Sequence, residues 1–167
     1  MIQEVEGDIL LTQAQVIAHG IAAQDPFDSG LALALRERWP SLVRDYRHAA
    51  RTHAVVPGDI WPWAGVNEDG SVRRIVNLVT QDSVGDGRSA RPGKATLENV
   101  GHALRHLARY LRDEKIASVA LPRLATGVGG LAWPDVKPLL EKHLGELGIP
   151  VIVYEVYRAG VQADEAL

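Results

Sequence analysis

The chain has 167 residues, of which 46% are hydrophobic and 23% charged, and its formal net charge is −3. This composition is typical of one globular domain that buries a sizeable core, and it excludes a disordered chain. The absence of cysteine excludes disulfides, thiol catalysis and zinc–thiolate sites, while the negative charge provides no general attraction for nucleic acid or anionic membranes, so an anionic ligand has to be bound by a local site.

The first third of the chain predicts two short strands followed by two helices. Residues 2–6 and 15–19 carry the short apolar runs typical of strands. Apolar side chains at helical spacing over residues 31–39 and 41–53 predict two helices. They are separated by Pro40, which stops the first helix, and by the serine after it, a plausible N-cap for the second.

The middle of the chain predicts a hairpin and then a long loop. Residues 58–63 predict an edge strand because Pro62 has no N–H to donate to a neighbouring strand. The turn signal at residues 67–70 connects it to a second strand over 74–80. Residues 81–93 are polar and glycine-rich, and we expect them to form a loop that is functional or mobile.

The last part of the chain alternates between helices and strands. Apolar stripes predict helices over residues 95–111 and 133–147, and apolar runs predict strands at 118–122 and 151–156. The final residues, 158–167, are polar and small, and we expect them to form a frayed tail.

This alternation predicts an α/β fold in which residues 1–157 form one domain. We expect a mostly parallel sheet with helices on both faces, and ligands bind such sheets beyond the carboxyl ends of the strands. Three loops follow strands at that edge: residues 20–30, 81–93 and 123–132. No apolar run approaches the roughly 20 residues of a membrane span, and no signal peptide is visible, so we expect a cytoplasmic protein without membrane contact.

The loop after the 118–122 strand is the most informative segment. It carries glycines at 127, 129 and 130, and Trp133 opens a helix immediately afterwards. Glycines let backbone N–H groups approach a phosphate closely, and a following helix adds its positive end. The pattern favours a phosphate site, although a strand-to-helix turn can carry glycines without binding anything, and neither common nucleotide-binding glycine motif is present.

Asp8 and His19 are candidate site residues with alternative interpretations. The Asp8 carboxylate, after the first strand, could accept a hydrogen bond from an exocyclic amine while a neighbouring N–H donates to a ring nitrogen; alternatively, it caps a turn or helix. His19 lies in a buried strand, which favours a structural, hydrogen-bonded histidine over a ligand. Ser29 is either the N-cap of a solvated turn or part of a diphosphate site.

The six histidines do not favour a metal site. Only His102 and His106 have the i, i+4 spacing, and no H-E-x-x-H motif is present, so we expect neither metal nor cofactor. Lys94, beside Arg91 in a glycine-rich segment, is the best positively charged candidate, and its alternative is an ordinary surface lysine.

Four motifs occur in an order that resembles one family. They are Gly7-Asp8-Ile9-Leu10; Ala18-His19 eleven residues ahead of Gly30-Leu31-Ala32; Lys94-Ala95-Thr96-Leu97-Glu98-Asn99; and Leu121-Pro122-Arg123-Leu124-Ala125-Thr126-Gly127-Val128 with Leu131 and Trp133. Across nearly its whole length the chain resembles the macrodomains, in particular the branch with terminal ADP-ribose protein glycohydrolase and the DarG antitoxin. This resemblance implies a three-layer α/β/α fold with a mixed, mostly parallel sheet, and a partner that is ADP-ribose or an ADP-ribosylated macromolecule.

The resemblance also implies roles for individual residues. Asp8 would bind the adenine amine and the Ile9 N–H the adenine ring. Lys94 matches the lysine that attacks C1″ of the distal ribose in the glycohydrolase. Two loops would bracket the diphosphate and the distal ribose, and the remaining candidate ligand-binding residues are His19, Ser29, Gly30, Leu31, Ala125, Thr126, Gly127, Val128, Gly129 and Gly130.

The chain departs from the family pattern at its catalytic positions. Gly129 stands where the glycohydrolase has its catalytic aspartate, and Asp28 stands where the first loop has glycine; that loop also lacks the asparagine of other macrodomains, with Gly20, Ala22 and Ala23 there instead. Asp28, as a base that positions water, and Lys94, as a nucleophile, are therefore the two candidate catalytic residues, and the sequence favours Asp28.

These residues leave three functions open. The first is a hydrolase that removes ADP-ribose from acidic side chains or related esters, and the second is a reader that binds ADP-ribose without turnover. The third, with less support, is a phosphatase acting on ADP-ribose 1″-phosphate.

Overall fold

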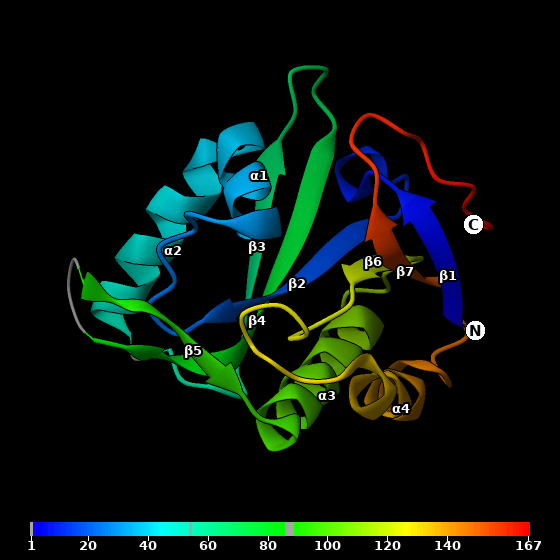
Figure 1. The fold of residues 1–167 in the computed structure, drawn as a ribbon. Coiled ribbons are helices and arrows are strands. Elements are labelled where there is room, and N and C mark those ends of the chain that lie inside the picture. Colours follow the sequence, from blue (N-terminus) through cyan, green and yellow to red (C-terminus); the bar gives the residue numbers. More distant parts are fainter. Residues whose placement is uncertain (1, 54, 86–88) are drawn as a thin grey trace.

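A computed structural model describes residues 2–53, 55–85 and 89–167 (Figure 1). Its strands are β1 (Ile2–Gly7), β2 (Val16–Ala22), β3 (Ile60–Val66), β4 (Val72–Val84), β5 (Arg91–Ala95), β6 (Val119–Pro122) and β7 (Val151–Tyr157). Its helices are α1 (Gly30–Arg38), α2 (Pro40–Thr52), α3 (Leu97–Asp113) and α4 (Trp133–Leu144), with a short 3₁₀ helix at Ile9–Leu11. The strands form one sheet in the order β1-β7-β6-β2-β4-β3, and β5 pairs with β4.

The sheet is mixed and mostly parallel, as predicted. β1, β7, β6, β2 and β4 run parallel to their neighbours, whereas β3 and β5 are antiparallel to β4. β2 and β4 pair from Val16 to Ala22, but β2 and β6 pair only at Val16 and Ile17. Beyond Ile17, the carboxyl-terminal halves of β2 and β6 are not paired with each other, and loops lie between them.

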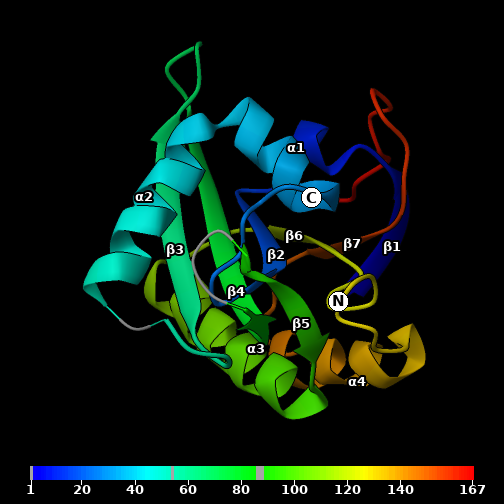
Figure 2. The same ribbon diagram turned by 60° about the vertical axis from the view of Figure 1, so that its left-hand side comes forward.

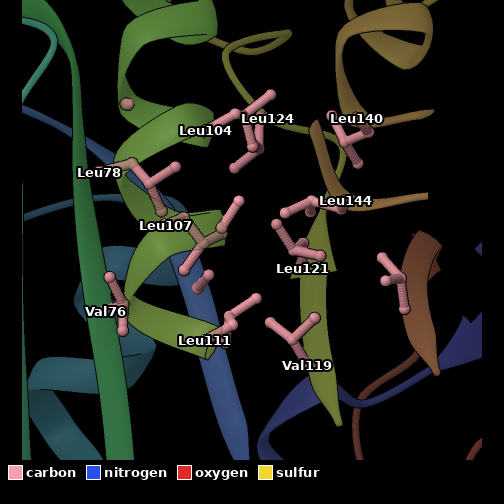
Figure 3. Close-up of a cluster of buried hydrophobic side chains, with 14 of the residues drawn as sticks. Val76, Leu78, Leu104, Leu107, Leu111, Val119, Leu121, Leu124, Leu140 and Leu144 are labelled. Atoms are coloured by element: carbon pink, nitrogen blue, oxygen red, sulfur yellow. The ribbon is translucent and has the colours of Figure 1, made fainter. Parts of the chain in front are cut away.

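Helices cover both faces of the sheet and enclose two separate cores (Figure 2). On one face, the leucines of α3 and α4 pack against β6 and β4, as Figure 3 shows for Leu104, Leu107 and Leu121. On the other face, α1 and α2 pack through Leu35 and Tyr46. Burial of each leucine side chain contributes about 1.5–3 kcal/mol. Because the sheet is sandwiched, its edge at the carboxyl ends of the strands is left to bind ligands.

The polar segment at residues 81–93 was predicted to be a loop, and this prediction is wrong for its described part. β4 continues to Val84, and Val84 pairs with Arg91 at the start of β5. Gln81 pairs with Ala95, and its side chain donates a hydrogen bond to the Gly93 carbonyl at 2.6 Å. The segment is therefore mostly an antiparallel extension of the sheet.

The boundary between the first two helices also differs from the prediction. Pro40 does not separate α1 from a helix capped by Ser41; it is the first residue of α2, and Trp39 is the N-cap. Proline is favoured at this position because its missing N–H would have no helical partner there.

The C-terminal residues 158–167, which we expected to fray, are mostly exposed but are held by hydrogen bonds. Glu165 accepts hydrogen bonds from the hydroxyls of Thr12 and Tyr154, and Ala163 is buried. The Asp8 N–H donates to the Val161 carbonyl at 2.7 Å. These contacts tie the tail to β7 and to the chain that follows β1. Within the described residues, no helix is both long and apolar enough to cross a bilayer.

Candidate ligand-binding cleft

A cleft of about 440 Å³ opens where β2 and β6 separate. Its walls come from β2, from the start of α1, from the second half of β4, from the start of β5, and from the loop after β6. The residues that line it are His19, Gly20, Ile21, Asp25, Ser29, Gly30, Leu31, Ala32, Thr80, Gln81, Pro92, Pro122, Arg123, Leu124, Ala125, Gly127, Val128 and Gly129. The strand ends predicted to meet at one edge thus do so around a single cavity.

The loop over residues 125–130 forms one wall and presents unpartnered backbone donors. It is closed internally by the Gly130 N–H bonding to the Gly127 carbonyl and the Leu131 N–H bonding to the Ala125 carbonyl, both at 3.0 Å. The Ala95 N–H holds it to β5 by donating to the Gly129 carbonyl at 3.0 Å. Among the described residues, the N–H groups of residues 125–129 have no acceptor. Successive free amides of this kind form an anion-binding concavity.

The N-terminus of α1 lines the same cleft and is also uncapped. Ser29 occupies the N-cap position, but its side chain makes no capping hydrogen bond. The residues after it, Gly30, Leu31 and Ala32, line the cleft, and their N–H groups are those that an α-helix leaves without internal acceptors. The loop and the positive end of α1 therefore both favour a negatively charged ligand.

An apolar hollow of about 330 Å³ continues the cleft, with which it shares Gly30, Leu31 and Pro122. Tyr154 and Tyr157 line its far side together with Ile9. The arrangement suits a flat, uncharged ring beside the polar part of the cleft.

Asp8 immediately precedes Ile9, which lines this hollow, and it is the N-cap of the short 3₁₀ helix Ile9–Leu11. Its Oδ1 accepts from the Leu10 N–H at 3.0 Å and its Oδ2 from the Gly160 N–H at 2.9 Å. The capping alternative is thus observed. It leaves lone pairs available for a ligand, because each carboxylate oxygen accepts more than one hydrogen bond.

His19 is the hydrogen-bonded structural residue that the sequence favoured. Its Nε2 lies 2.6 Å from Oδ1 of Asn77, its partner across the β2–β4 ladder. The Asn77 amide donates to the Trp61 carbonyl, so Nε2 of His19 is the donor in its pair. Burial lowers the pKa of His19 to about 4, and the ring is neutral at physiological pH.

The first loop places Asp25, rather than Asp28, in the wall of the cleft. Asp28 is exposed and is not among the cleft-lining residues. The Asp25 carboxylate accepts from the N–H groups of Ala22 and Phe27 at 2.9 and 2.8 Å. Burial raises its pKa, the two backbone hydrogen bonds lower it, and the nearby charge of Asp28 raises it further.

Lys94 lies on β5 against the outside of the glycine loop. The chain is exposed there, and Nζ lies 3.5 Å from the Val128 carbonyl oxygen. A Cβ at Gly129 would lie 2.6 Å from the Ala125 carbonyl oxygen, so this backbone does not accept an aspartate at 129. Within the described residues there is no group of three or more side chains suited to a metal ion.

A family model described as the Macro domain matches residues 24–140, which is most of the chain. The chain belongs to the Macro domain family. This macrodomain is similar to DNA ADP-ribosyl glycohydrolases of Mycobacterium tuberculosis, 28% identical over 92% of this chain, and of Thermus aquaticus, 28% identical over 93%. The matches cover 42% and 41% of those two proteins, so the chain spans less than half the length of the curated relatives.

Solved structures extend this likeness to three dimensions. The DarG macrodomain of M. tuberculosis superposes with a TM-score of 0.79 and 26% identity, covering 92% of this chain and 97% of that one. The DarG macrodomain of T. aquaticus has a TM-score of 0.77 and 27% identity, with 93% and 98% covered. The predicted fold is confirmed.

Several residues that line the cleft or the hollow of this macrodomain were not among the predicted site residues, including Asp25, Thr80, Gln81, Tyr154 and Tyr157. Thr80 and Gln81 fell in or beside the segment predicted to be a loop. Tyr154 lies in the middle of the last strand, where it pairs with Pro122 of β6, and Tyr157 ends that strand.

Proposed function

We propose that this macrodomain binds ADP-ribose and hydrolyses its bond to a modified macromolecule. The observation that carries the proposal is the pair of unpartnered amide sets, residues 125–129 and the start of α1, in the walls of one cleft. They fit the diphosphate, and the adjoining apolar hollow, which Ile9 lines, fits the adenine, with Asp8 next to Ile9 in the chain. The distal ribose then lies toward Asp25 and Gln81.

The relatives named DNA ADP-ribosyl glycohydrolases support a nucleic acid as the modified macromolecule. Hydrolysis breaks the bond between C1″ and the leaving atom, adds a water oxygen at C1″, and returns a proton to the leaving group. Among the described residues at that end of the cleft, Asp25 is the carboxylate in position to handle the proton, and Lys94 lies behind the glycine loop.

Calorimetry with ADP-ribose tests the binding part of this proposal. We expect one site per chain with a micromolar Kd, on the order of −8 kcal/mol. Incubation with an ADP-ribosylated single-stranded oligonucleotide and with a glutamyl-linked ADP-ribosylated protein tests the hydrolytic part. Release of ADP-ribose from either is the expected result, and absence of binding contradicts the whole proposal.

A reader without turnover is the second candidate, and Gly129 favours it, because the catalytic aspartate of the terminal ADP-ribose protein glycohydrolase has no counterpart at that position. Tight binding of ADP-ribose with no release from either substrate would establish the reader and exclude the hydrolase.

A further inference from the structure

Four arginines border one groove on the outer side of α1 and α2. Arg36 comes from α1, and Arg44, Arg47 and Arg51 follow at intervals of three and four residues along α2, which places them on one helix face. The groove measures about 450 Å³, and all four side chains are exposed. We call it the arginine groove.

The groove carries a net positive charge, because its four arginines outnumber the one carboxylate among its described lining residues, Glu37. Among the described residues, Arg36, Arg47 and Arg51 have no hydrogen bond or ion pair. Arg44 pairs with Asp45 at 3.5 Å, and Asp45 is also shared with the Trp63 indole N–H. Like charges gathered in one groove repel each other, and an anion bound there relieves the repulsion. In a chain of net charge −3, this is a local basic surface.

The arginine groove is connected to the ligand cleft by shared residues. Arg47 and Arg51 also line a second hollow, of about 710 Å³, which has Asp25 in its opposite wall. Asp25 in turn lines the central cleft. An ADP-ribose whose adenine lies in the apolar hollow would place its distal ribose at the Asp25 end. The macromolecule attached to that ribose would then leave the cleft through the second hollow toward the arginines.

Resting on the proposed function, we infer that the arginine groove binds the phosphate backbone of the nucleic acid strand that carries the ADP-ribose. A phosphodiester chain has one negative charge per nucleotide, which suits cations repeated along a helix face. The guanidinium group is suited to phosphate because it can donate two parallel hydrogen bonds to it. The groove would orient the strand and leave recognition of ADP-ribose to the cleft.

A charge-matched pair of variants tests this inference. Arg47→Gln/Arg51→Gln removes two charges from the groove. Arg105→Gln/Arg109→Gln removes two exposed arginines from α3, on the opposite face of the sheet, and neither of them makes a hydrogen bond or ion pair among the described residues. The probe is a short, unmodified, fluorescein-labelled single-stranded DNA of mixed sequence, titrated by anisotropy over a salt series.

We expect the groove variant to bind this DNA at least tenfold more weakly at low salt. The slope of log affinity against log salt should become shallower by about 0.7 for each phosphate that the variant no longer neutralises. The control variant should match the unmodified protein, and both variants should retain its Kd for free ADP-ribose and its melting temperature.

The inference would be overturned by an absence of DNA binding by the unmodified protein, by an equal loss in both variants, or by no loss in the groove variant. A polyglutamate peptide that binds the groove more tightly than the DNA would also overturn it. Failure of the proposed function is read separately, from calorimetric binding of free ADP-ribose and from its release from modified substrates by the unmodified protein.

Discussion

Asp25 and Asp28 lie three residues apart and differ in what surrounds them. Asp25 lines the cleft and holds the first loop through the Ala22 and Phe27 N–H groups, whereas Asp28 is exposed. Asp25→Asn keeps the size of the side chain but replaces one acceptor oxygen with a donor. It should cost about 1–3 kcal/mol of stability, the range for a stranded backbone donor.

We expect Asp25→Asn to lower kcat for release of ADP-ribose more than tenfold, which corresponds to about 1.4 kcal/mol in the activation barrier. The kcat of Asp28→Asn should stay close to that of the unmodified protein. Steady-state kinetics and calorimetry on both variants check this. A loss confined to Asp28→Asn would instead support the base predicted from sequence.

Tyr157 offers a second test at this scale, since its ring borders the apolar hollow and is 55% exposed. If it stacks on the adenine, Tyr157→Ala should weaken ADP-ribose binding by about 1–3 kcal/mol, the range for base–aromatic stacking. Tyr157→Phe, which keeps the ring, is the control and should bind normally. Equal losses in both variants would assign the effect to the hydroxyl.

The sequence predicted the role of a single residue best where one short segment determines its structural environment. His19 in a buried strand and Asp8 after a strand were both placed correctly, Asp8 by its capping alternative. That Asp25 and not Asp28 lines the cleft could not be predicted, because the direction of each carboxylate depends on the backbone conformation of the loop. Phe27, which has a φ of 54° and a buried ring against Tyr46, determines the conformation of this loop.

At the scale of an element, the glycine loop separates steric from electrostatic effects. A Cβ at Gly127 would have no heavy atom within 4 Å, and its φ is not positive, so a side chain fits there without strain. Gly127→Glu should therefore retain the melting temperature and lose ADP-ribose binding, because its carboxylate repels the diphosphate. Gly127→Ala is the uncharged control and should bind. Normal binding by Gly127→Glu would show that the loop is only a turn.

Gly129 should behave in the opposite way. A Cβ there would meet the Ala125 carbonyl oxygen at 2.6 Å, closer than side chains approach backbone, so the loop has to move. Gly129→Ala should lower the melting temperature even without ligand, as a thermal scan would show.

The elements themselves were predictable where the apolar period is regular. α3 was predicted from its leucine stripe, and it begins where Thr96 Oγ1 accepts from the Asn99 N–H at 3.1 Å. β5 could not be predicted, because Arg91-Pro92-Gly93-Lys94 has no apolar alternation and pairs only through contacts with β4, such as that of Gln81 with Gly93.

For the whole molecule, His19 predicts how stability depends on pH. Its folded pKa of about 4 lies below the ordinary value of 6.5. Below pH 6.5 the unfolded chain therefore takes up a proton that the folded protein does not, and stability falls until about pH 4. The loss amounts to about 3 kcal/mol at 1.36 kcal/mol for each pKa unit. Asp25, with its raised pKa, opposes part of this loss.

Urea unfolding between pH 7 and 4 measures this dependence. His19→Gln, whose amide can still donate to Asn77, should show a flatter profile over that range. A profile as steep as that of the unmodified protein would assign acid sensitivity to other groups.

Contacts with other segments also explain why the hydrogen bonds of the tail could not be predicted. Residues 158–167 contain little apolar surface, which is typical of fraying, but their stabilising partners, Thr12, Gln13 and Tyr154, come from distant parts of the chain. The polar residue that makes these contacts, Glu165, gives no local signal of burial or pairing.

The pairing of β1 with β7 has a consequence for the order in which the molecule folds. Ile2 pairs with Val151, so the first strand has no neighbour in the sheet until the last one is available. The β3–β4 hairpin involves short loop closures and can form early, whereas closing a loop of nearly the whole chain carries a larger entropic cost. During synthesis, β1 and the Asp8 that follows it must therefore wait for β7. The apolar hollow beside the cleft, which Tyr154 and Tyr157 of β7 line, is the last part of the site to be completed.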